Sequence, residues 1–172
     1  MKKIIFSIFA LPLIALCCSM SLNAQSSEKD LDQVELMKQF VGTWVAERAE
    51  DSTLIWEVTP FAKGYECIGH WQAKGETYST FKGFLGFAKQ YELVNMFYLW
   101  PAGTFSRDLG KFVSDKKMTL ERFNAVHTHV MSTIEVNFIT ADKHIWVFKQ
   151  RGMKETWDDA NEFEFIFIRV KK

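Results

Sequence analysis

The chain has little cysteine, little proline and no excess of either charge. Three cysteines and three prolines occur in 172 residues, and 21 basic side chains balance 21 acidic ones. This balance, with no block of clustered cations, gives no support for a nucleic-acid-binding surface. Beyond the first 24 residues there is also no apolar run long enough to cross a bilayer as a helix.

The first 24 residues have the pattern of a secretory signal peptide. Two lysines precede an apolar run that ends at Cys18, and a short polar stretch then leads to the small residue Ala24. We therefore expect cleavage near Ala24, a secreted or periplasmic protein, and no membrane span after cleavage. Anchoring as a lipoprotein through Cys17 or Cys18 is the less favoured alternative, because Leu16 stands where a lipid-attachment motif has a small residue.

The predicted mature chain is one domain. Removing 24 of 172 residues leaves 148, and the loss of two lysines brings the formal charge to −2. Residues 25–30 read as a polar leader, and residues 31–172 are long enough to bury a core. Cys67 is the one cysteine left, so no intrachain disulfide can form, and we expect its thiol to be buried as a small apolar group.

A short helix and then a long series of strands are predicted. Asp30 or Asp32 can cap a helix that runs through Phe40, with Leu31, Val34, Met37 and Val41 as its apolar stripe. From Gly42 onward the apolar period is two, and Val, Ile, Thr and aromatic residues are frequent. The expected strands are Thr43–Glu50, Leu54–Phe61, Gly64–Lys74, Glu76–Phe87, Tyr91–Trp100, Thr104–Ser114, Lys117–Phe123, His129–Ile139, Lys143–Arg151 and Asn161–Val170.

Short turns between these segments predict an all-β fold. The expected architecture is a single antiparallel up-and-down β-barrel of about 8–10 strands with a short N-terminal α-helix. Closure removes the exposed edges that an open sheet would have, and a sandwich is the alternative. Alternation in the last strand places Phe163, Phe165 and Phe167 on the inner face, and the preceding strand places Trp146 and Phe148 there.

The opening of the first strand carries a resemblance to known barrels. A short helix followed by Phe-Val-Gly-Thr-Trp, with Gly42 and Trp44, resembles the Gly-x-Trp start of lipocalins and intracellular fatty-acid-binding proteins, together the calycin barrels. The stretch FKGFLGFAKQYELVNMFYLWPAG is similar to secreted bacterial lipocalin-like domains of unknown function. The resemblance implies that Trp44 closes one barrel end and that Arg169 of the last strand packs across it.

The resemblance also has limits in the sequence. The second lipocalin motif, Thr-Asp-Tyr, and the long C-terminal helix of lipocalins are not recognisable. The final strand reads Arg169-Val170-Lys171 and has no Arg-x-Tyr pair, so the fatty-acid carboxylate clamp of the fatty-acid-binding proteins is not carried over.

Aromatic residues make up 15% of the chain, more than a small barrel needs to close. Apolar pockets with a few polar groups are typical of small-ligand sites, although ten strands can also fill a narrow barrel with their own side chains. Phe97 and its neighbour Tyr98 cannot both point inward. The candidates to line a cavity are Trp56, Tyr65, Trp71, Phe81, Phe97, Trp100 and Trp146, with Tyr98 as the alternative to Phe97.

Residues that could support catalysis are few. His127 and His129 are two apart on a predicted strand end and could share a metal ion, but a polar hairpin explains them better, so no metal or other cofactor is assigned. His70 could form a buried acid–base pair with Glu66, but polar groups of this kind on a strand more often face solvent, and that reading is favoured here. The sequence has no nucleophile elbow, P-loop, Cys-x-x-Cys pair or His-Glu-x-x-His motif, and no catalytic residue is assigned.

The sequence thus favours non-catalytic binding of a small apolar or amphipathic ligand inside the barrel. One alternative is an enzyme with a histidine-based metal or acid–base site in the barrel. The other is a filled barrel that acts as a protein-interaction module. The oligomeric state is left open.

Overall fold

The structure, a computed structural model, describes residues 31–49, 51–123, 129–152 and 155–171. The predicted signal peptide and leader, Cys17, Cys18 and His127 lie outside the described residues. The described residues form a short helical segment and ten strands. Their bounds are α2 (Gln33–Leu36), the 3₁₀ turn η1 (Met37–Phe40), β1 (Gly42–Ala49), β2 (Ser52–Phe61), β3 (Gly64–Ala73), β4 (Glu76–Ala88), β5 (Leu93–Leu99), β6 (Phe105–Ser114), β7 (Lys117–Phe123), β8 (Val130–Thr140), β9 (Lys143–Gln150) and β10 (Asn161–Arg169).

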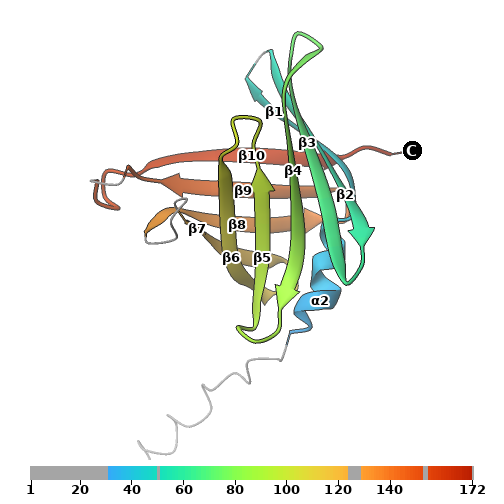
Figure 1. The fold of residues 1–172 in the computed structure, drawn as a ribbon, viewed down its shortest axis with the longest axis vertical. Helices are drawn as coiled ribbons and strands as arrows, with labels where there is room; N and C mark the ends of the chain where they lie inside the picture. Colours follow the sequence, from blue (N-terminus) through green and yellow to red (C-terminus); the bar gives the residue numbers. More distant parts are fainter. Residues whose placement is uncertain (1–30, 50, 124–128, 153–154, 172) are drawn as a thin grey trace, which may run out of the picture. The chain divides into compact units, whose positions relative to one another are not determined.

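The ten strands close into one barrel. Each strand pairs antiparallel with the next in sequence, and β10 pairs with β1, so the connections contain no crossover (Figure 1). The predicted all-β, up-and-down barrel is confirmed, and the sandwich alternative is wrong. Closure pairs each described strand on both sides, so the sheet has free edges only where β1 and β10 separate, as described below.

The period-two pattern places the core inside the barrel. In β5, Val94, Met96 and Tyr98 are buried, and the residues between them face outward. In β10, Phe165 and Phe167 are buried while Ile166 and Ile168 are exposed on the outer surface. The inner faces predicted for β9 and β10 are therefore confirmed.

The helical segment covers one barrel end. The Asp32 side chain accepts a hydrogen bond from the Glu35 backbone N–H at 3.0 Å, so this cap begins α2. The helix tightens into η1 at Met37, and a 3₁₀ turn repeats every three residues, which buries Met37 and Phe40 together. The predicted α-helical stripe is therefore wrong in part, because Val34 is exposed and Phe40, which was left out, is buried.

Hydrogen bonds fasten this segment to the barrel. The Gln33 amide donates to the Phe112 carbonyl at 3.1 Å and accepts from the Phe112 N–H at 2.7 Å, which satisfies both backbone groups of that β6 residue. The Gln39 amide donates to the Asp115 carbonyl in the next turn. Within the part of the chain that the structure describes, no helix is long and apolar enough to cross a membrane.

Trp44 and Arg169 close the helix-covered end. The two residues are paired across β1 and β10, and the Arg169 guanidinium carbon lies 4.1 Å from the centre of the Trp44 ring. Arg169 also donates to the carbonyls of Val41, Gln39 and Ala141, while the Trp44 indole N–H donates to the Phe40 carbonyl at 2.7 Å. These contacts match the arrangement that the resemblance implies for the barrel end.

Gly42 makes that approach possible. Its φ of +131° lies where residues with a side chain are strained, and a Cβ atom there would collide with the Arg169 guanidinium. The glycine therefore has two reasons to be present, its backbone conformation and the space that the arginine occupies.

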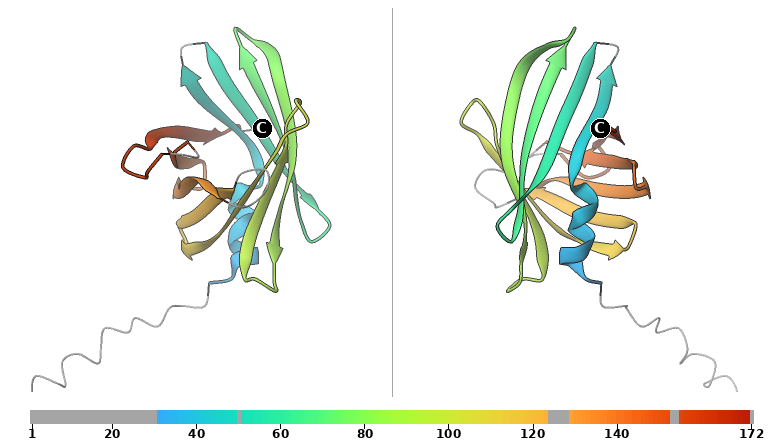
Figure 2. Two further views of the ribbon diagram at one scale, coloured as in Figure 1. Left: turned by 60° about the vertical axis from the view of Figure 1, so that its left-hand side comes forward. Right: turned by 90° about the vertical axis from the view of Figure 1, so that its right-hand side faces the viewer.

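The seam between β1 and β10 is short. It comprises the pairs of Trp44, Val45 and Ala46 with residues 167–169, whereas β10 pairs with β9 over residues 161–168. Beyond Ala46 the two strands are no longer paired, and Figure 2 shows strands β2, β3 and β4 rising away from β9 and β10. The barrel is thus open at the end opposite the helical segment.

Candidate functional site

A cavity of about 250 Å³ occupies the open half of the barrel. Its depth is indicated by burial, since Trp56, Trp146 and Phe167 are almost fully buried while Trp71 and Trp100 are partly exposed. The cavity therefore has a closed floor and a mouth. Its lining comprises Arg48, Leu54, Trp56, Trp71, Phe81, Tyr98, Trp100, Arg122, Trp146, Phe148, Gln150, Phe163, Phe165 and Phe167.

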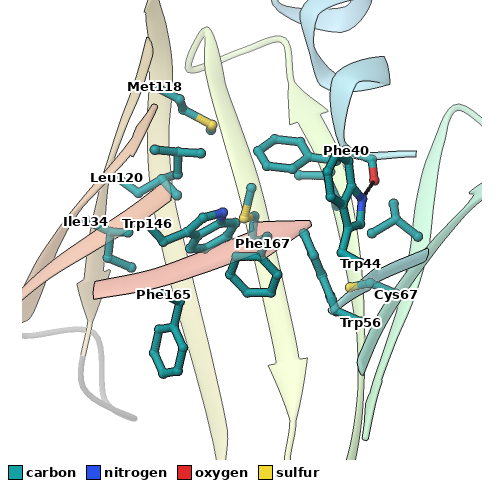
Figure 3. Close-up of a cluster of buried hydrophobic side chains, with 14 of the residues drawn as sticks. Phe40, Trp44, Trp56, Cys67, Met118, Leu120, Ile134, Trp146, Phe165 and Phe167 are labelled. Carbon is teal, nitrogen blue, oxygen red and sulfur yellow. Dashed lines mark hydrogen bonds between the residues drawn. The ribbon is translucent and has the colours of Figure 1, made fainter. Parts of the chain in front are cut away.

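The half of the barrel below the cavity is filled. Phe40 reaches in from η1 and contacts Trp56 and Trp146 edge-on, with ring centres 5.8 and 6.0 Å apart. Figure 3 shows Phe40 and Trp44 at this end, with Trp56, Trp146 and Phe167 between them and the open half. The two interiors expected as alternatives, filled and hollow, occur in the same barrel, one in each half.

Aromatic rings make up one wall of the cavity. Trp71 of β3 packs against Phe165 of β10 with ring centres 5.8 Å apart, and Phe81 of β4 packs against Trp100 at 4.6 Å. Gly69, the inward position beside Phe81, leaves room for that ring, because a Cβ atom on Gly69 would overlap it. Such a wall offers a large apolar area with restricted rotamers, which suits a flat or branched apolar ligand.

The opposite side of the cavity, from β5 to β9, adds polar groups beside the rings of Trp146 and Phe148. Arg122 donates two hydrogen bonds of 2.8 Å to the Asp108 carboxylate through its Nε and Nη2 atoms, and this carboxylate is fully buried. Burial acts to lower the pKa of Arg122, but the charge of Asp108 and its hydrogen bonds outweigh burial and raise that pKa. The guanidinium also lies over the Phe148 ring, 5.5 Å from its centre. Arg122 therefore stays protonated, and its hydrogen bonds hold it in a fixed orientation at the cavity wall.

Tyr98 adds a hydroxyl to the polar groups on this side of the cavity. Its pKa is raised well above the ordinary value because the residue is buried and because Cys67 and Asp108 lie nearby, an effect that Arg122 partly offsets. The hydroxyl donates to the Met96 sulfur at 3.4 Å, a weak acceptor. Tyr98 is therefore neutral at any physiological pH and can exchange this weak contact for a better acceptor on a ligand.

Arg48 stands at the mouth on a β-bulge. Glu47 pairs with Thr53 and Ala49 pairs with Ser52, so Arg48 is the extra residue of β1. Its guanidinium carbon lies 5.8 Å from the Trp71 ring centre and 5.9 Å from that of Phe165. The side chain therefore spans the place where β1 and β10 have stopped pairing.

His144 lies below the floor and not in the cavity. It is fully buried, its ring centre is 4.2 Å from that of Trp44, and it stacks on Phe167 at 4.8 Å. The Trp146 indole N–H donates to its Nδ1 atom at 2.9 Å, so the proton of the neutral ring is on Nε2. Burial first, and the charge of Arg169 second, lower the pKa of His144 to about 3. A histidine that stays neutral in this way is a packing element here.

The Cys67 thiol is an inert core group. It is buried, and burial raises its pKa to about 12, although the neighbouring Trp56 indole opposes that rise. Figure 3 shows Cys67 beside Trp56 at the closed end. The Trp56 N–H makes no hydrogen bond of regular geometry with any residue that the structure describes. The expectation of a small buried hydrophobe at Cys67 is confirmed.

Five of the seven predicted lining residues lie around the cavity: Trp56, Trp71, Phe81, Trp100 and Trp146. Two do not. Tyr65 points inward but is buried at the closed end, within electrostatic range of Lys38 and Glu35 from the helical segment. Phe97 is on the outer face and stacks on Phe105 at 5.5 Å, because its neighbour Tyr98 takes the inward position.

His70, predicted as an alternative acid–base group, does not lie inside the barrel. His70 lies on the outward face of β3, where its Nδ1 atom is 3.0 Å from the Thr80 hydroxyl, and Glu66 pairs with Lys82. An acid–base pair of His70 and Glu66 inside the barrel is therefore wrong. Among the described residues, which include His129 but not His127, no cluster of three or more His, Cys, Asp and Glu could hold a metal ion.

The polar residues of the cavity were not predicted from the sequence, although the pattern of β7 indicates one of them, Arg122. In β7, Met118, Leu120 and Arg122 share one face, so a charged residue continues an apolar stripe. Asp108 and Arg122 are directly paired between β6 and β7, which the sequence alone does not reveal. Arg48 left no such signal, because its position depends on a bulge.

No family model matches the chain, and a search of the curated proteins found none that matches it.

Proposed function

We propose that this chain is a lipocalin-like, calycin-type barrel that is secreted or periplasmic and binds a small apolar or amphipathic molecule without catalysing a reaction. The observation that carries the proposal is the cavity in the open half, which is lined mainly by aromatic rings together with a few polar side chains. Closure of the other end by Trp44 and Arg169 supports the calycin assignment. The predicted signal peptide is the basis for the location.

The cavity is suited to binding. Its volume of about 250 Å³ is just below the range of roughly 300–1,000 Å³ common for small-molecule pockets, so it fits a ligand of up to about three rings or a short branched chain. Burial of apolar ligand surface contributes about 25 cal/mol per Å² before the costs of ordering. The arginine, tyrosine and glutamine side chains would orient the molecule.

The groups near the cavity do not favour catalysis. Tyr98 is held neutral, Asp108 is held by Arg122, and the core histidine and cysteine lie beneath the floor. The pKa values of Tyr98, Cys67 and His144 are all shifted away from neutrality, where general acid–base or covalent catalysis would use them.

The first test is native mass spectrometry of the protein purified from the periplasm of an expression host, followed by organic extraction. We expect a stoichiometric small molecule, and the extract would give its chemical class. A direct measurement uses the neutral fluorescent probe N-phenyl-1-naphthylamine. Four of the six tryptophans, Trp56, Trp71, Trp100 and Trp146, line the cavity, so binding should also quench tryptophan fluorescence.

A matched pair of variants locates the binding site. Leu54→Trp fills the cavity, because Leu54 lines it, whereas Leu99→Trp makes the same change on the exposed outer face. We expect the first variant to lose probe binding and the second to keep it, with circular dichroism confirming that both fold. A bare mass together with a probe that does not bind, or equal binding to both variants, would contradict a ligand site in the cavity.

A further inference from the structure

The charges that line the cavity within the described part of the chain have one sign. Arg48 and Arg122 are the charged residues among the described ones that line it, and none of those described residues carries a carboxylate. The two arginines differ in their electrostatic state. The charge of Arg122 is balanced by the buried Asp108 carboxylate, which accepts hydrogen bonds from its Nε and Nη2 atoms. Arg48 has no acidic partner among the described residues, and its side chain is exposed at the mouth.

The setting of Arg48 restricts its guanidinium without neutralising it. Contacts with the rings of Trp71 and Phe165, both of which line the cavity, keep the guanidinium above the aromatic wall. A planar guanidinium in contact with rings still presents hydrogen-bond donors at its edge, in the fork that matches a carboxylate. A bulge is also a common device for aiming one side chain out of the regular pattern of a strand.

From these observations we propose that the ligand is an ionised apolar acid whose oxyanion, such as a carboxylate, pairs with Arg48 at the mouth while its apolar body lies against the aromatic wall. This inference rests on the proposed binding function and specifies its ligand class. Trp56 and Trp146 on the cavity floor are the deepest apolar surface that the body of the acid would reach.

Arg122 has a different role toward the same ligand. A second anion beside Arg122 would face the Asp108 carboxylate, which is fully buried, and like charges repel strongly where water is excluded. The two opposite charges of the Arg122–Asp108 pair balance. The Nη1 atom of Arg122 is not part of the two hydrogen bonds to Asp108. It is therefore suited to donate to an uncharged oxygen midway along the ligand, and the anionic group belongs at the mouth.

The test compares two probes that differ in charge, 2-naphthoate and its methyl ester, by isothermal titration calorimetry. We expect naphthoate to bind about tenfold more tightly than the ester, the effect of one charge-assisted hydrogen-bonded pair that is partly screened by water. Raising NaCl from about 0.02 to about 0.5 M should reduce this preference, because the shorter screening length weakens an interaction at an exposed mouth.

Three variants test the assignment to Arg48. Arg48→Gln should bind both probes about equally and leave the ester affinity within about twofold, whereas Arg48→Lys should keep part of the preference because it keeps the charge and loses the fork. Arg107→Gln is the matched control, since Arg107 carries the same charge on the outer face of β6, where it donates to Asn95. We expect this control to bind both probes as the unmodified protein does.

The outcomes separate this inference from the proposed function. Equal binding of naphthoate and ester to the unmodified protein would overturn the preference for an acid and leave a neutral-ligand carrier. A preference for naphthoate that persists in Arg48→Gln would overturn the role of Arg48. If neither probe binds, the proposed function fails and the inference fails with it.

Discussion

Acid should destabilise the barrel through His144. This side chain is fully buried, and its pKa is lowered from 6.5 to about 3. Between these two pKa values the unfolded chain binds a proton that the folded chain does not. The free energy of unfolding therefore falls as the pH falls, by about 1.4 kcal/mol per pH unit, and the contribution of His144 is fully present above the unfolded pKa.

The magnitude follows from the pKa values. At pH 4.5 the unfolded histidine is charged and the folded one is still neutral, so the loss relative to pH 7.5 is about 3 kcal/mol. That is a large fraction of the roughly 5–15 kcal/mol by which most domains are stable. Urea unfolding followed by tryptophan fluorescence at a series of pH values measures this loss.

A matched variant isolates His144 from the carboxylates, which also protonate in acid. Glu135, for example, has a lowered pKa because of hydrogen bonds from Lys117 and Asn137. His144→Gln cannot be protonated, and its amide oxygen can still accept the Trp146 indole N–H that His144 accepts at 2.9 Å. We expect this variant to lose about 3 kcal/mol less than the unmodified protein between pH 7.5 and 4.5.

Parallel pH profiles for the two proteins would refute this reasoning. That result would mean that His144 binds its proton equally well in the folded and unfolded states, and so is not the neutral packing element that the ring contacts indicate. Nitrogen-15 NMR of the histidine ring offers a second measurement. It should show a proton on Nε2 and no titration above pH 4, because Nδ1 accepts from Trp146.

Two further substitutions should separate stability from binding. Arg169→Met removes the cation over Trp44 and leaves backbone carbonyls before β1 without their hydrogen-bond donor. The free energy of unfolding should therefore fall by about 2–4 kcal/mol, while the folded protein binds N-phenyl-1-naphthylamine as before. Weaker binding without lower stability would contradict this expectation. Gly69→Ala should push the Phe81 ring into the cavity and weaken binding of the same probe. Gly86→Ala is the control and should leave binding unchanged, because a Cβ atom there meets open space. Equal titration curves for the two variants would count against Phe81 as a lining residue.

Much of the fold could be predicted because one face of each strand had to be apolar. Alternation alone placed Trp146 and Phe165 inside, and the spacing of turns gave the number and order of the strands. Short regular strands between clear turn residues leave little freedom for another register. The helical stripe was harder, because the change from α to 3₁₀ geometry at Met37 depends on packing against the barrel end.

The candidate site was predicted less completely, for physical reasons that differ from residue to residue. Phe97 and Tyr98 are both aromatic, so the pattern could not decide which one points inward. The pairing of Asp108 with Arg122 depends on the register between two strands. Arg48 reaches the mouth because one extra residue shifts the phase of β1, and a bulge has no reliable mark in the local sequence.

The short seam between β1 and β10 has a consequence for the order of folding. Every other strand pair joins neighbours in sequence, but this one joins Trp44 to Arg169 across almost the whole domain. Closing so long a loop costs more chain entropy than forming a hairpin, and three residue pairs give little in return until the ring of Trp44 and the guanidinium of Arg169 meet. The nine hairpins should therefore form first, and the barrel should close last by pairing of β1 with β10. The same pairing should open first in the folded protein, so the amide protons of the seam should exchange before those of the hairpins.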